Sequence, residues 1–204
     1  MPTMLKLETK RAWVFDLDGT LTRPVHDFAD IRRQLGIPPS ADILGYLAAL
    51  TPAAARPLHE KLHAIEMQLS ARTEAAPGAV DCVGWLARRG VRLGILTRNS
   101  RVIARQTLAV LGLADYFPAE LIIGRDEAPP KPSPDGLHQL AAGWGLSADD
   151  LVMVGDYLFD LQTGRAAGAA TVHVDPTGAF AWPDLADFCV TTLHDLIAHF
   201  TQGE

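Results

Sequence analysis

The sequence predicts an α/β protein built on a doubly wound parallel sheet, with a small α-helical insert near its amino terminus. Three short apolar runs, at residues 12–15, 91–96 and 151–154, have the continuous hydrophobic character of strands buried on both faces. Stretches with helical spacing of apolar residues lie between strands, which predicts right-handed crossovers in a parallel sheet. Residues 27–74 show only helical spacing, and this segment is the predicted insert.

The first predicted strand, residues 12–15, leads into the segment DLDGT at residues 16–20. Open α/β sheets place their chemistry just beyond the carboxyl ends of their strands. Side chains two residues apart in an extended segment point the same way, so we expect Asp16 and Asp18 to face one small volume. Two carboxylates brought together repel each other, which favours a bound cation. The residues that follow do not supply the further ligands of a calcium loop.

The predicted insert carries two groups of apolar residues at helical spacing, and both predict helices packed by one face. Pro24 and the pair at residues 77–78 mark its expected hinges. The apolar positions of the two helices are Phe28, Ile31 and Leu35, then Leu58, Leu62, Ile65 and Leu69.

The second long strand, residues 91–96, is followed by Thr97 and then by Arg98, Asn99 and Ser100 at the start of a predicted helix. A hydroxyl beside the unpaired N–H groups of a helix start suits a phosphate oxygen. The same residues are also ordinary helix-capping residues. Both interpretations remain open from this segment alone.

Two later segments add further polar groups at strand ends. Residues 121–123 predict a short strand, and Lys131 follows in a loop whose prolines restrict the backbone and aim the ammonium group. The strand at residues 151–154 leads into Asp156, which would complete an acidic cluster with the first two carboxylates. Asp160 either complements the dipole of the next helix or pairs with Lys131.

Taken in order, these segments resemble the four motifs of the haloacid dehalogenase superfamily of Mg²⁺-dependent phosphohydrolases. The resemblance implies a Rossmann-like core made of residues 1–23 and 77–204. It also implies a small helical cap, residues 24–76, of the phosphoglycolate phosphatase-like kind, which lies over the catalytic cleft. The matching motifs are DLDGT at residues 16–20, Thr97, Lys131 and GDYLFD at residues 155–160.

The resemblance also implies a mechanism. Asp16 would be the nucleophile that forms an aspartyl-phosphate, and Asp18 would act first as general acid and then as general base. A Mg²⁺ cofactor would be bound by Asp16, by the backbone carbonyl of Asp18 and by Asp156, because this ion prefers hard oxygen ligands. The implied activity is that of a phosphoric monoester hydrolase.

The remaining motif residues would bind and position the phosphoryl group. Thr97 and Lys131 would contact its oxygens, together with N–H groups at Arg98 and Asn99. Asp160 would support Lys131. Residues of the cap would set specificity, and the candidates are Arg23, His26 and Arg32.

Other functions share parts of this pattern. A phosphosugar mutase of the same superfamily would use the same catalytic residues and return the phosphoryl group to a sugar. A phosphoaspartate signalling or binding module also combines acids, Mg²⁺, Thr and Lys on a parallel sheet, although it carries no cap. Asp18 and Asp156 count against a dehalogenase, which needs neither an acid nor a metal. The residues of the predicted cap do not identify which phosphate ester is the substrate.

Composition excludes several classes of partner. The chain has 204 residues, 48% hydrophobic content and a net charge of −6 without a basic block, which argues against nucleic acid and anionic membranes. No apolar segment reaches the ~18 residues that span a bilayer. We expect a cytoplasmic protein whose partner is a small-molecule phosphate ester. Cys82 and Cys189 lie in apolar contexts and are expected to be buried thiols.

Overall fold

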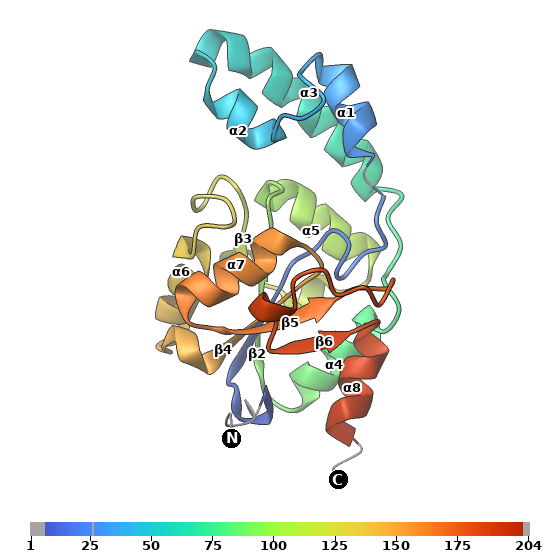
Figure 1. Ribbon diagram of the computed structural model, residues 1–204, viewed down its shortest axis with the longest axis vertical. Coiled ribbons are helices and arrows are strands. Elements are labelled where there is room, and N and C mark those ends of the chain that lie inside the picture. Colours follow the sequence, from blue (N-terminus) through green and yellow to red (C-terminus); the bar gives the residue numbers. More distant parts are fainter. Residues whose placement is uncertain (1–6, 26, 202–204) are drawn as a thin grey trace.

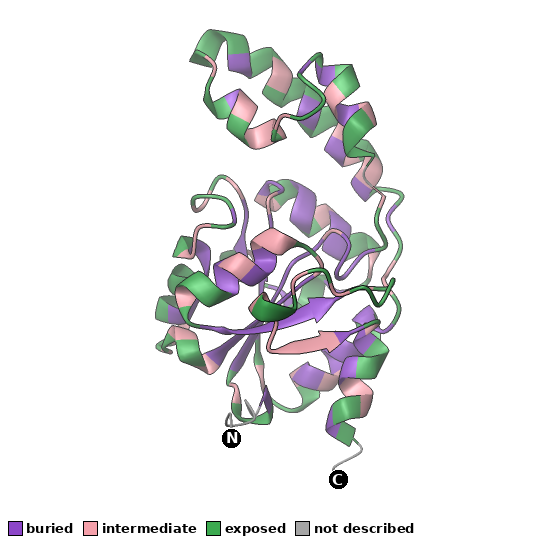
Figure 2. Ribbon diagram, viewed as in Figure 1, coloured by how far each residue is buried: buried purple, intermediate pink, exposed green. Residues whose placement is uncertain are grey.

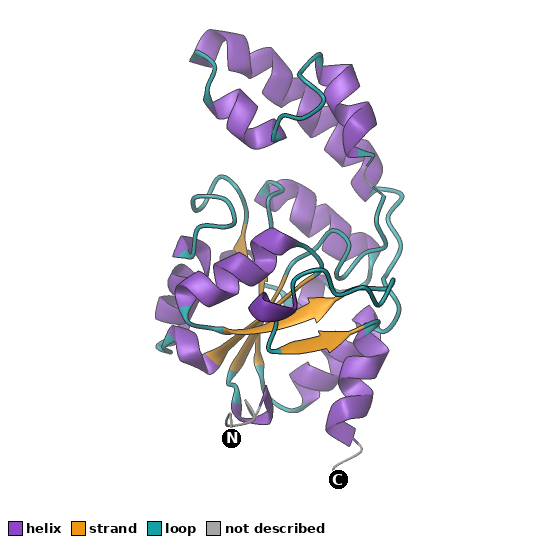
Figure 3. Cartoon of the chain, in the orientation of Figure 1, coloured by secondary structure: helices purple, strands orange, loops and turns teal. Residues whose placement is uncertain are grey.

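The structure is a computed structural model that describes residues 7–25 and 27–201. Its centre is a six-stranded parallel sheet (Figures 1 and 3) in which β1 lies between β2 and β4. The predicted fold class is therefore confirmed. The strand order is β3-β2-β1-β4-β5-β6, with β1 at Ala12–Phe15, β2 at Arg92–Leu96, β3 at Ile122–Ile123, β4 at Leu151–Gly155, β5 at Ala170–Val174 and β6 at Phe188–Val190.

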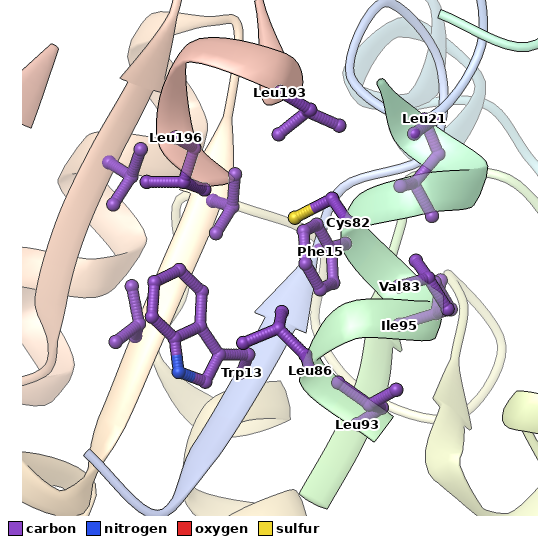
Figure 4. Close-up of a cluster of buried hydrophobic side chains, with 14 of the residues drawn as sticks. Trp13, Phe15, Leu21, Cys82, Val83, Leu86, Leu93, Ile95, Leu193 and Leu196 are labelled. Carbon is purple, nitrogen blue, oxygen red and sulfur yellow. The ribbon is translucent and has the colours of Figure 1, made fainter. Parts of the chain in front are cut away.

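Helices cover both faces of this sheet. Alternate residues of β1 point to opposite faces, so Trp13 and Phe15 join one buried cluster while Ala12 and Val14 join another. The first cluster packs against α4 (Ala79–Arg88), α5 (Arg101–Val110) and α8 (Leu193–Thr201), and the second packs against α6 (Asp135–Trp144) and α7 (Leu158–Ala167). Figure 4 shows the first cluster, where α4 and α8 close over β1.

The strands were predictable because their side chains are buried on both sides. All four residues of β1 and all five of β4 are buried, and Figure 2 shows the central strands in the buried colour. Short 3-10 helices occur in the connections between these elements. They lie at Leu7–Thr9, Ala114–Tyr116, Ala119–Leu121, Ala148–Asp150 and Pro183–Leu185.

Three helices form a separate unit beyond the carboxyl edge of the sheet (Figure 1). They are α1 (Phe28–Leu35), α2 (Ile43–Ala48) and α3 (Pro52–Ser70), and we call them the helical unit. The periodicity had predicted α1 and α3 but not the six-residue α2. The unit has its own small core, made of Ile31, Leu35, Ile37, Leu47 and Leu62.

The chain enters and leaves the helical unit along two adjacent segments. Thr22 and Ala75 form an antiparallel bridge, and the N–H of Arg23 donates to the carbonyl of Glu74 at 2.9 Å. The N–H of Ala76 donates to the carbonyl of Leu21 at the same distance. These bonds tie the two connections together at the base of the unit.

Both cysteines are free thiols, and the expected burial is confirmed for Cys82 but wrong for Cys189. Cys82 is buried on α4, and burial raises its pKa to about 12, whereas Cys189 on β6 is only half-buried. Among the helices of the described ranges, none has the length and apolar character that a membrane span requires.

Candidate active site

The parallel register brings three polar residues to one edge of the sheet. Phe15 of β1 pairs with Ile95 of β2 and with Val154 of β4, so the residues just beyond these strands are neighbours in space. They include Asp16, Thr97 and Asp156, and all three line a pocket of about 460 Å³. The helical unit forms the opposite wall of this pocket through residues of α1, α2 and α3.

Lys131 joins two of the predicted carboxylates. Its Nζ atom donates to Asp16 and to Asp160, at 2.5 Å in each case, and its side chain is only 3% exposed. Burial alone would lower the pKa of Lys131, but the two carboxylates outweigh this effect and raise it. The lysine is therefore a fixed positive charge beside Asp16. Both interpretations of Asp160 hold, because it pairs with Lys131 and also lies in the first turn of α7, where its Oδ2 accepts a bond from the N–H of Tyr157 at 3.0 Å.

Three carboxylates lie close enough to share a cation. Oxygen atoms of Asp16, Asp156 and Asp160 all lie within 4.8 Å of one another. Burial is the main reason that the pKa values of Asp16 and Asp156 rise to about 7, and the neighbouring carboxylates raise them further. A divalent cation would relieve this repulsion, and an all-oxygen donor set suits Mg²⁺. The residues present therefore fit the metal that the sequence predicted.

The turn after β1 is shaped around Asp156. The hydroxyl of Thr20 donates to Oδ1 of Asp156 at 2.8 Å and orients that carboxylate. Gly19 has a φ of 91°, a conformation that favours glycine, and a Cβ atom at this position would overlap the Asp156 carboxylate. The glycine of the DLDGT segment thus makes room for an acidic side chain that lies far away in the sequence.

Asp18 lies beside the cluster and is held by a different partner. The side-chain amide of Asn99 donates to Oδ2 of Asp18 at 2.6 Å. Burial is the main cause that raises the pKa of Asp18 to about 7. A carboxyl group with a pKa near neutrality can both give and take a proton, as a general acid and base must.

Thr97 is buried at the end of β2. Its Oγ1 accepts a bond from the N–H of Asn99 at 3.1 Å, which leaves the hydroxyl proton able to point into the pocket. Ser100 caps α5, since its side chain accepts from the N–H of Ile103. Ser100 therefore accounts for the capping interpretation, while Thr97 lines the pocket and its contact with a phosphate stays a prediction.

Only some of the remaining predicted site residues line the pocket. Arg98 lines the pocket, but its guanidinium binds Asp42 at 2.7 and 2.9 Å and lies over the ring of Phe159. Arg32 lines the pocket from α1. Arg23 is not among the residues that line this pocket; it is exposed, with Nε 3.6 Å from Glu74. His26 lies outside the described residues.

Sequence reasoning missed the groups that connect the two walls of the pocket. Arg125, which follows β3, makes two bonds to Glu66 of α3, at 2.7 and 2.8 Å. Glu66 follows Leu62 by four positions and so lies on the buried face of its helix, a signal that could have identified it. Asp42 is the N-cap of α2, and a capping residue can be recognised in the sequence. That signal does not predict its ion pair with Arg98, which lies far away in the sequence.

The chain is similar to known hydrolases. Residues 10–168 match the family model described as haloacid dehalogenase-like hydrolase. A haloacid dehalogenase-like hydrolase domain-containing protein from Arabidopsis thaliana is 34% identical, over 90% of this chain and 77% of its own length. A phosphoglycolate phosphatase from Neisseria meningitidis is also 34% identical, over 82% of this chain and 81% of its own.

Solved structures show the same fold. A hydrolase from Pseudomonas syringae superposes with a TM-score of 0.78 at 25% identity, covering 95% of this chain and 98% of that chain. A haloacid dehalogenase family hydrolase from Deinococcus radiodurans, solved with bound phosphate and sodium, has a TM-score of 0.69 at 23% identity, covering 95% and 96%. The second likeness supports the fold alone.

Proposed function

This chain belongs to the haloacid dehalogenase-like hydrolase family, and we propose that it hydrolyses small-molecule phosphate monoesters through an aspartyl-phosphate on Asp16, with Mg²⁺ as cofactor. The observation that carries the proposal is the setting of Asp16. This carboxylate lines the pocket, accepts a hydrogen bond from the buried ammonium of Lys131, and has oxygen atoms within 4.8 Å of those of Asp156 and Asp160. A nucleophilic carboxylate needs such positive charge nearby before it can approach a phosphate.

The metal would be held by side-chain oxygens of Asp16 and Asp156 and by the backbone carbonyl of Asp18. When bound, Mg²⁺ neutralises charge on the phosphoryl oxygens and orients the ester for in-line attack. The raised pKa values of the two side chains support this assignment, because a cation would favour the ionised forms that burial disfavours.

Two proton transfers by Asp18 complete the reaction. As an oxygen of Asp16 forms a bond to phosphorus, the bond from phosphorus to the ester oxygen breaks, and Asp18 gives its proton to the departing alkoxide. Asp18 then removes a proton from water, which attacks phosphorus and frees Asp16 and inorganic phosphate. The bond from Asn99 to Asp18 supports this role by fixing the carboxyl group that must serve both steps.

Lys131 and Thr97 would hold the transferring phosphoryl group. The ammonium of Lys131 supplies a positive charge at a fixed place, and the Thr97 hydroxyl supplies a neutral donor. Asp160 holds Lys131 in position. Because these donors are buried and already oriented, little reorganisation is needed when charge develops on the phosphoryl oxygens.

We assign residues 24–76 as the cap of this enzyme. The helical unit supplies one wall of the pocket, and two ion pairs between residues that line the pocket join it to the core. Closure of such a unit excludes water from the reacting atoms and supplies contacts to the leaving group.

The test is phosphate release from a panel of phosphate esters with and without Mg²⁺. We expect metal-dependent release by the parent protein and none by Asp16→Asn, which keeps the shape of the side chain and removes its nucleophilic charge. Asp115→Asn, at an exposed position, is the matched control and should behave as the parent. Equal release by Asp16→Asn would refute the assignment, and isomerised sugar phosphate in place of free phosphate would identify the mutase.

A further inference from the structure

A buried histidine lies on β5, beside the strand that leads to Asp156. In the parallel register His173 pairs with Gly155, the residue before Asp156. His173 is only 1% exposed, and its strand neighbours Val172 and Val174 are buried apolar residues. Burying a polar ring costs free energy unless its polar atoms are hydrogen-bonded. The contacts of this ring therefore show what a histidine gains at a position where an apolar residue would also be buried.

The ring of His173 is bonded to the backbone of Asp156. Nε2 lies 3.3 Å from the carbonyl oxygen of Asp156. A carbonyl can only accept, so Nε2 carries a proton and donates it. Within the described part of the chain, Nδ1 has no hydrogen-bond partner. The bond to Asp156 is thus the hydrogen bond that distinguishes this ring from an apolar side chain.

Aromatic side chains fix the orientation of the His173 ring. Trp182 lies tilted beside it, with ring centres 5.4 Å apart, and Phe180 meets it edge-on at 5.8 Å. Trp182 also packs edge-on against Tyr157, the residue after Asp156, with ring centres 5.4 Å apart. The same tryptophan therefore contacts both the donor that binds the Asp156 carbonyl and the residue that follows Asp156.

Asp156 is thus held through its side chain and through its backbone. The hydroxyl of Thr20 donates to its Oδ1 at 2.8 Å, and His173 donates to its carbonyl. The nearby carboxylates of Asp16 and Asp160 disfavour the ionised form of Asp156, which is the form that binds a cation. Groups that orient a ligand side chain before the metal arrives strengthen metal binding.

We propose that His173 is a positioning residue for the metal site, because its bond to the Asp156 carbonyl holds the Asp156 side chain where it can bind Mg²⁺. This inference rests on the proposed function, which makes Asp156 a metal ligand. It adds a residue that belongs to none of the four motifs. His173 is not among the residues that line the pocket, so it acts through Asp156 and not on the ester.

The experiment measures Mg²⁺ binding to the metal-free protein by titration calorimetry, which needs no turnover. His173→Phe keeps a ring beside Trp182 and removes the donor, so we expect its dissociation constant to be about tenfold or more above that of the parent. His173→Gln keeps an N–H donor and should retain most of the affinity. Val172→Ala is the control for a general loss of stability, because Val172 points to the other face of β5, and it should bind as the parent does.

Enzyme kinetics provide a second measurement. His173→Phe should need more Mg²⁺ for half-maximal phosphate release, and its kcat at saturating Mg²⁺ should be close to that of the parent. Thermal unfolding shows whether each metal-free variant is folded, and His173→Leu replaces His173→Phe if the larger ring prevents folding.

The outcomes separate this inference from the proposed function. Parent-like Mg²⁺ affinity in His173→Phe, or an equal loss of affinity in His173→Gln or Val172→Ala, overturns the role of His173. A parent protein that binds no Mg²⁺ overturns both the cofactor and this inference. Phosphate release that survives Asp16→Asn refutes the phosphatase mechanism, whereas the calorimetric comparison of the His173 variants would still stand.

Discussion

Glu66 and Arg125 form a buried ion pair with two hydrogen bonds, and it joins α3 of the helical unit to the segment that follows β3. The guanidinium of Arg125 also reaches the carbonyl of Arg98, so one side chain contacts both the helical unit and the strand end that carries Thr97. Arg125 thus links the helical unit directly to the carboxyl edge of the sheet.

Removing one partner of this pair should destabilise the protein. Glu66→Ala leaves a buried guanidinium without its countercharge, and we expect it to lower the free energy of unfolding by about 3 kcal/mol. Glu60→Ala on the same helix breaks an exposed pair with Arg56 and should cost below ~1 kcal/mol. Urea denaturation measures the free energy of unfolding of both variants. Equal losses would show that the buried pair stabilises the protein no more than the exposed pair does.

Binding of Mg²⁺ should release protons near neutral pH. The pKa values of Asp16 and Asp156 are about 7 without metal, so part of the population carries protons that the metal must displace. Affinity should therefore fall as pH is lowered from 8 to 6. Titration calorimetry in two buffers of different ionisation enthalpy measures the protons released, and identical heats in both buffers would contradict this expectation.

The raised pKa of Asp156 also predicts how the stability of the metal-free protein depends on pH. The folded-state pKa of Asp156, about 7, lies above the ordinary value of 3.8, so its contribution to stability is favourable at low pH and is lost as pH rises through about 7. Asp156→Asn removes this dependence. In EDTA, the Tm of the parent relative to this variant should fall between pH 5 and pH 8, and added Mg²⁺ should reverse the fall at pH 8. A constant difference would exclude the raised pKa.

Asp18→Asn should slow hydrolysis most for esters with poor leaving groups. Loss of a general acid typically costs about 10²- to 10⁴-fold when the departing alkoxide needs a proton. A nitrophenolate leaves without one, so its ester should show a smaller loss in the phosphorylation step. Single-turnover phosphorylation rates for an alkyl and a nitrophenyl phosphate test this, and equal losses would argue against Asp18 as the acid.

Gly19→Ala should abolish Mg²⁺-dependent activity. The new Cβ would overlap the Asp156 carboxylate and displace a proposed metal ligand. Gly90→Ala is the matched control, since Gly90 also has a positive φ, 73°, but nothing lies within 4 Å of the added atom. The control should lose about 1 to 2 kcal/mol of stability from backbone strain and keep its activity. Retained Mg²⁺ affinity in Gly19→Ala would refute the role of the turn.

Much of the fold was predictable because the strands of a parallel sheet are apolar throughout. β1 and β4 stand out in the sequence for this reason, and the polar residues that follow them mark the edge where chemistry occurs. The family motifs are local, so their order along the chain was enough to anticipate that Asp16, Lys131 and Asp156 would meet.

The contacts across the pocket were not predictable in the same way. Whether Arg98 turns toward a phosphate or toward Asp42 depends on where α2 lies, and no local pattern encodes that position. The pairing of Glu66 with Arg125 joins residues 59 positions apart on different elements. Such pairs follow from tertiary packing, so only coordinates reveal that most of the arginines around the pocket are already engaged.

The bridge between Thr22 and Ala75 places the two chain segments that lead into and out of the helical unit side by side. A segment whose two ends are neighbours can be exchanged for one of another length without rerouting the sheet, because only the junction has to be preserved. Under the proposed function, the residues that react with phosphate and the residues that select the leaving group are therefore encoded in separable stretches of sequence. Selection can remodel residues 24–76 toward new esters while the residues proposed to bind the metal and attack phosphorus are inherited unchanged.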